Sequence, residues 1–103
     1  MFDCRGLRNP AHVPELSDLT GFDPAIAEFF GNDDEAIAFA GDCSNIIRNS
    51  LPMLRRKGVL EINVAFGCIG GQHRSVWCAA RVASMLSSMP GVAVSVTHSE
   101  LER

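Results

Sequence analysis

The sequence predicts an α/β domain with a small, mainly parallel sheet of about three to four strands flanked by helices. An apolar run rich in β-branched residues at 59–66 is followed by a helical pattern at about 75–88 and a second strand-like run at 92–97. This order forms a βαβ unit at residues 59–97. Its strands should be parallel, because a crossover helix returns the chain to the same end of the sheet.

Composition predicts one globular domain spanning residues 1–103. Hydrophobic residues make up 47% of the chain and charged residues 20%, which is typical of a folded domain. No run approaches the ~20 apolar residues that span a bilayer, and the first residues lack the apolar segment of a secretory signal. We therefore expect a cytoplasmic protein with no membrane partner. The four cysteines form no CxxC pair and are expected to be reduced.

The amino-terminal half predicts a short strand, a loop and two helices. Met1–Arg5 is the candidate strand, and prolines interrupt the loop after it. Asp23-Pro24 is typical of an N-cap followed by proline in the first helical turn. A longer helix should begin at Asp33–Glu35, whose negative charges suit the positive end of a helix dipole. Its apolar stripe is Ala36/Ile37, Ala40, Cys43, Ile47, Leu51 and Leu54.

Two residues should shape the end of this longer helix. Pro52 should kink it or restart it, because proline lacks a backbone N–H. Gly58 should stop it after three cations, Arg55, Arg56 and Lys57.

In the carboxy-terminal half, the apolar strand at 59–66 should lie centrally in the sheet. The helix at about 75–88 should bury Val76, Ala79, Ala80, Ala83 and Met85.

The segment 67–75 is the candidate site. It joins a strand to a helix, which is where parallel α/β sheets bind ligands. Three glycines, Gly67, Gly70 and Gly71, let a ligand approach the backbone, and the helix N-terminus favours an anion. Arg74 supplies a planar fork for phosphate, and Gln72, His73 and Ser75 are further donors. These features predict a phosphate or carboxylate site.

The sequence of this segment can be compared with the motifs of two enzyme classes. The chain contains no G-K-[ST] and has one lysine, Lys57, so we do not expect a P-loop ATPase. The spacing from Cys68 to Arg74-Ser75 matches the C-x5-R-[ST] loop of cysteine-dependent phosphatases, with Cys68 as nucleophile. Asp23 is the one candidate general acid, but it already suits an N-cap. We expect no catalytic residue, with the phosphatase as the alternative.

Residues 67–76 read G-C-I-G-G-Q-H-R-S-V. They resemble the G-C-T-G-G-x-H-R-S-V signature in the C-terminal domain of the bacterial RapZ-type RNase adaptor family of nucleotide-binding proteins. The opening F-D-C-R-G-L-R-N-P from Phe2 resembles the family's F-D-x-R-x-L-x-N-P. Pro14-Glu15-Leu16 and Leu19-Thr20-Gly21 also match its P-E-L and L-T-G. The resemblance covers essentially the whole chain.

The resemblance implies a fold similar to the sugar-phosphate-binding half of phosphofructokinase-like proteins. It implies a sensor or adaptor domain for an amino-sugar phosphate, with a small regulatory RNA and a homo-oligomer as candidate partners. The resemblance covers the family's C-terminal domain and not its P-loop domain, so we do not expect nucleotide hydrolysis to carry over, and a separate ATPase chain is a candidate partner. Ile69 stands where the family has threonine, which puts sugar specificity in doubt. His12, Ile69 and His98 are candidates to line the cleft.

The net charge and the spacing of possible metal-binding residues limit which nucleic acids and metals the chain could bind. The net charge of −3 excludes strong, indiscriminate nucleic-acid binding. A local patch of Arg5 and Arg8 with the cations at 55–57 remains a candidate RNA contact. No set of His, Cys, Asp or Glu has metal-ligand spacing, so we expect no metal and no cofactor. Trp77 is expected to pack or to contact another subunit.

Overall fold

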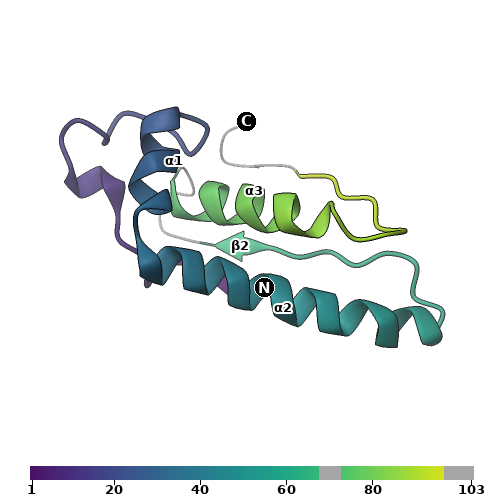
Figure 1. The fold of residues 1–103 in the computed structure, drawn as a ribbon. Coiled ribbons are helices and arrows are strands. Elements are labelled where there is room, and N and C mark those ends of the chain that lie inside the picture. Colours follow the sequence, from purple (N-terminus) through teal and green to yellow (C-terminus); the bar gives the residue numbers. More distant parts are fainter. Residues whose placement is uncertain (68–72, 97–103) are drawn as a thin grey trace.

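The computed structural model describes residues 1–67 and 73–96 and has an α/β fold (Figure 1). Its strands are β1 (Phe2–Asp3) and β2 (Phe66–Gly67), and a short 3₁₀ helix η1 covers Pro10–His12. The α-helices within the described ranges are α1 (Pro24–Gly31), α2 (Asp34–Arg56) and α3 (Arg74–Leu86). None of the helices in these residues is long and apolar enough to cross a membrane.

The two strands form a parallel sheet, as predicted. Phe2 is paired with Phe66 and Asp3 with Gly67. The backbone N–H of Cys4 extends the pairing by donating to the Gly67 carbonyl at 2.7 Å. The phenyl rings of Phe2 and Phe66 lie 5.4 Å apart and cover one face of the pair. Both strands end at the same edge of the sheet, next to the beginning of α3.

The predicted strand at 59–66 is wrong for most of its length, and the predicted number of three to four strands is not confirmed. Within the described residues, β2 covers only Phe66–Gly67, and 92–96 forms no strand. Residue 97, which ends the second predicted strand and the βαβ unit, lies outside the described residues. A strand requires a neighbour for its backbone N–H groups, and among the described residues those of 60–64 and 93–96 donate to no backbone carbonyl.

The expected central, buried position of this strand is also wrong. Leu60 is 99% exposed and Val64 is 39% exposed. Apolar strand-like sequence normally has both faces covered, whereas residues 60, 61 and 63–65 are exposed here.

Local capping signals predicted the helix starts correctly. The Asp23 carboxylate accepts a hydrogen bond from Ala25 N at 2.9 Å at the start of α1. The Asp33 carboxylate caps α2 by accepting from Glu35 N at 3.0 Å and Ala36 N at 3.3 Å.

The other end of α2 was predicted in part. Gly58 follows the helix with a φ of +81°, a conformation that favours glycine. The expected restart at Pro52 is wrong, since α2 continues through it to Arg56.

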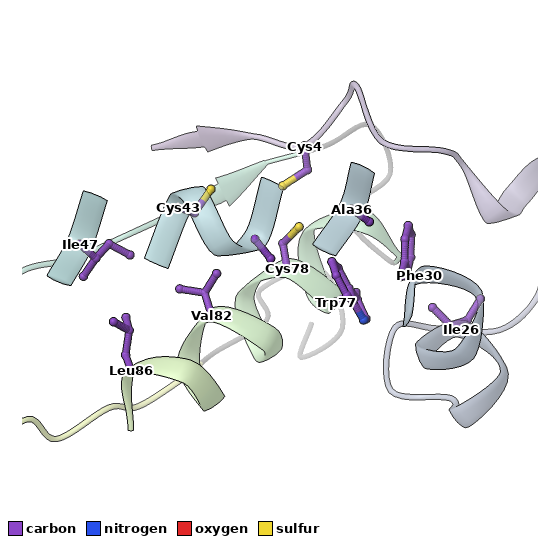
Figure 2. Close-up of a cluster of buried hydrophobic side chains, with 11 residues drawn as sticks. Cys4, Ile26, Phe30, Ala36, Cys43, Ile47, Trp77, Cys78, Val82 and Leu86 are labelled. Atoms are coloured by element: carbon purple, nitrogen blue, oxygen red, sulfur yellow. The ribbon is translucent and has the colours of Figure 1, made fainter. Parts of the chain in front are cut away.

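The core lies between the three helices and the end of β1 (Figure 2). The Trp77 ring stacks on Phe30 with centroids 5.1 Å apart, which confirms a packing role for Trp77. The predicted buried side of α3 needs correction, because Ala80 is exposed while Ala79, Ala83 and Met85 are only half-buried. Helix α3 contacts α1, α2 and β2, and residues 74–78 at its start are all buried. Its buried apolar residues are Val76, Trp77, Cys78, Val82 and Leu86.

Candidate functional site

The carboxyl edge of the parallel strands adjoins the N-terminus of α3. The chain leaves β1 through Cys4 and Arg5, and it leaves β2 at Gly67. The side chain of Arg74, the first residue of α3, reaches back to the exit of β1: its Nη1 donates to the Arg5 carbonyl at 3.0 Å. This is the kind of edge at which α/β proteins bind ligands, because strand ends and a helix N-terminus meet there.

Three consecutive polar residues are buried at this edge. His73, Arg74 and Ser75 are 8%, 6% and 8% exposed. Long charged side chains are seldom buried to this extent, so the guanidinium brings a positive charge into a largely enclosed position. The first turn of α3 contains no acidic residue that would offset this charge locally.

His73 joins the start of α3 to a distant loop. It is the N-cap residue of α3, but its side chain does not cap the helix. Instead its Nε2 hydrogen bonds to the Leu19 carbonyl. Its own carbonyl accepts the first helical hydrogen bond, from Trp77 N at 2.9 Å. His73 therefore positions the loop before α1 against the site.

Gly21 allows this loop to approach α3 closely. A Cβ built on Gly21 would lie 2.5 Å from Val76 Cγ1, 2.6 Å from Val76 Cβ and 3.2 Å from the His73 carbonyl oxygen. A residue with a side chain cannot occupy that space without moving its neighbours. Thr20-Gly21 thus forms one wall beside the α3 N-terminus.

The exposed rim of the site carries an ion pair. Asp3 Oδ2 lies 2.8 Å from Arg5 Nη2, and both side chains are more than half exposed. Hydrogen bonds from Arg5 lower the pKa of Asp3, and the nearby charge of Arg74 adds a smaller effect in the same direction. A carboxylate so close to the site makes the potential at the rim less positive than two arginines alone would give.

The structure brings together only part of the predicted site. His73, Arg74 and Ser75 are side by side in sequence and buried, whereas His12 is exposed in η1. The other predicted positions lie outside the described residues, as does the alternative nucleophile; they are Cys68, Ile69, Gly70, Gly71, Gln72 and His98. Asp23 serves as the N-cap of α1, which is the role its sequence context predicted.

The sequence did not predict three features of the candidate site: the carbonyl groups of Arg5 and Leu19, which accept hydrogen bonds there, and the lack of a side chain at Gly21. The matches at Leu19-Thr20-Gly21 and at the F-D-x-R opening could have directed attention to these segments. They could not indicate that backbone atoms make the contacts.

A long groove reaches the same edge. It has a volume of about 960 Å³ and is lined by α2, α3 and the extended segments 59–67 and 91–96. Gly67 and Ser75 belong to its lining, so the groove and the α3 N-terminus are continuous. Among the described residues, no group of three His, Cys, Asp or Glu side chains could hold a metal ion.

Comparison with known proteins gives a consistent assignment. The family model of the RapZ C-terminal domain matches residues 1–102. A nucleotide-binding protein of Ruegeria pomeroyi is 40% identical over 103 residues, which are 100% of this chain and 36% of that protein. Another from Paramagnetospirillum magneticum is 37% identical over 102 residues, which cover 99% of this chain and 33% of that protein. The chain spans about a third of the length of these relatives. It belongs to the RapZ C-terminal domain family.

Proposed function

We propose that this domain is a non-catalytic sensor or adaptor module that binds a phosphorylated small molecule at residues 67–75. The observation that carries the proposal is Arg74, a buried arginine in the first turn of α3, at the carboxyl edge of two parallel strands. A buried guanidinium and a helix N-terminus both favour an anion, and a phosphate can accept hydrogen bonds from both.

The proposed ligand class is a sugar phosphate, with an amino-sugar phosphate as the first candidate. The family resemblance supports this class, and the described residues of the 67–76 signature, Gly67 and residues 73–76, lie at the edge where Arg74 is buried. The relatives are named nucleotide-binding proteins, but this chain covers only about a third of their length and contains no G-K-[ST]. We therefore assign no nucleotide to residues 67–75.

The adaptor role would involve further partners, for which the structure gives unequal support. The basic residues of the candidate RNA patch lie on different elements: Arg8 stacks on Phe29 of α1, whereas Arg55, Arg56 and Lys57 lie at the end of α2. Any RNA contact would therefore use one group or bridge both. A homo-oligomer agrees better with the exposed apolar side chains of Leu60 and Val64.

The test is a thermal-shift titration with inorganic phosphate, sulfate and a panel of sugar phosphates including glucosamine 6-phosphate. A ligand at 100 times its dissociation constant adds about 2.7 kcal/mol, which raises Tm by roughly 10–20 °C in a domain of this size. We expect this shift in the wild type and its loss in Arg74→Gln.

Arg55→Gln is the matched control. Arg55 also donates to a backbone carbonyl, that of Gly91 at 2.8 Å, but it lies at the far end of α2 from the site. The control should lose some stability and keep the whole ligand-induced shift. An equal ligand-induced shift in wild type and Arg74→Gln would contradict the assignment of Arg74.

A further inference from the structure

Two buried thiols from distant parts of the chain face each other in the core. Cys4 follows β1, Cys78 lies in the second turn of α3, and each is fully buried. Figure 2 shows their sulfur atoms directed toward one another. We infer that Cys4 and Cys78 are a redox-active pair, which a hydroperoxide converts to an intramolecular disulfide that ties the end of β1 to α3.

The arrangement selects this pair among the described cysteines. Cys78 hydrogen bonds to Cys4, and this bond lowers the pKa of the Cys4 thiol even though burial opposes it. Burial raises the pKa of the third thiol, Cys43, with a smaller contribution from the nearby Cys4. The thiolate is the reactive form, so Cys4 is the sulfur that should be oxidised first.

The chemistry balances with hydrogen peroxide as the oxidant. The Cys4 thiolate attacks one peroxide oxygen, the O–O bond breaks, and the departing hydroxide takes up a proton to become water. The product is a sulfenic acid on Cys4. The Cys78 sulfur then attacks the Cys4 sulfur, and the hydroxyl group leaves as water with the Cys78 proton. Both sulfurs are oxidised and the peroxide is reduced to two molecules of water.

The burial of Cys4 should limit the rate at which its thiolate reacts with peroxide. Cys4 is held against β2 by a strand pairing of only two residues, together with its own N–H bond to the Gly67 carbonyl. Short pairings of this kind open locally at a lower free-energy cost than the core. A peroxide molecule, which is little larger than water, can reach the pair during such openings. The pair should therefore react more slowly than an exposed thiol but without global unfolding.

The disulfide would lie beside the candidate site. Cys4 directly precedes Arg5, whose carbonyl accepts the Arg74 hydrogen bond, and Cys78 lies one helical turn after Arg74. The inference does not depend on anion binding, because the thiol pair exists whatever the site binds.

The sequence makes the test direct, because trypsin places each cysteine in a different peptide. Cys4 falls in residues 1–5, Cys43 in 9–48, Cys68 in 58–74 and Cys78 in 75–81. The reduced, folded protein is treated with hydrogen peroxide, blocked with an alkylating reagent and analysed by intact mass and peptide mapping. We expect most chains to lose two hydrogens and M-F-D-C-R to be linked to S-V-W-C-A-A-R. The oxidised protein should have a higher Tm, because the bond closes a long loop, and a reductant should reverse the change.

Two variants complete the test. Cys43→Ala/Cys68→Ala should form the same linked peptide. Cys78→Ser, which keeps a hydrogen-bond donor beside Cys4 but cannot form a disulfide, should leave a sulfenic acid on Cys4 that dimedone captures. If Cys78→Ser does not fold, the wild-type peptide map decides the matter. The inference is overturned if the native protein links Cys4 to Cys43 or Cys68, or if the expected link forms only in denaturant.

Discussion

Replacing Gly21 with alanine should destabilise the domain by overpacking the junction between the loop before α1 and the first turn of α3. The new Cβ would lie 2.5 Å from Val76 Cγ1 and 2.6 Å from Val76 Cβ, and 3.2 Å from the His73 carbonyl oxygen. Both Val76 and His73 are buried, so neither can move into solvent. Overpacking of a rigid core costs typically 1–3 kcal/mol, and we expect about 2 kcal/mol here.

Chemical denaturation and thermal unfolding measure this cost. In a domain of about 100 residues, 2 kcal/mol corresponds to a fall in Tm of roughly 8–16 °C. Gly6→Ala is the matched control, because a Cβ at Gly6 meets nothing within 4 Å. Val76→Ala in the Gly21→Ala background should restore only part of the stability, since it removes Cγ1 and leaves the Val76 Cβ in place.

Gly21→Ala should also weaken phosphate binding. The loop that must move carries the Leu19 carbonyl, which is the hydrogen-bond partner of His73. Its displacement disturbs the first turn of α3, where the proposed ligand lies. If Gly21→Ala unfolds at the same temperature as Gly6→Ala, the close packing of the loop against α3 is refuted.

Three further predictions concern the fold. Asp33→Ala should lower the free energy of unfolding by about 1 kcal/mol, measured in urea, because α2 loses the cap on two backbone N–H groups; an unchanged midpoint would contradict this role. Gly58→Ala should lower Tm because its φ of +81° is unfavourable for alanine, whereas Gly41→Ala within α2 should raise stability by up to about 1 kcal/mol; the two melting curves should shift in opposite directions. Leu60→Lys should reduce any self-association seen by light scattering, since Leu60 is 99% exposed, and an unaltered mass in an oligomeric wild type would place the interface elsewhere.

Local signals in the sequence determined much of the helical structure. Asp23-Pro24, the acidic start at Asp33 and the stop at Gly58 each act through a few adjacent backbone groups, and all three were confirmed. Such signals are readable because both partners of the interaction lie within about four residues of each other. The strand predictions succeeded less well, because a strand depends on a neighbour that the sequence does not specify.

The same distinction applies to the site. The sequence alone determined that the strand-to-helix segment before Arg74 is rich in glycine, ends in the polar residues Gln72 and His73 and is followed by a helix, and it identified the family by its motifs. The tertiary structure decided what His73 and Arg74 contact. Their partners are the carbonyl groups of Leu19 and Arg5, which are 54 and 69 residues away. Every residue has a backbone carbonyl, so no residue type marks these partners, and only the folding of the chain brings them to the start of α3.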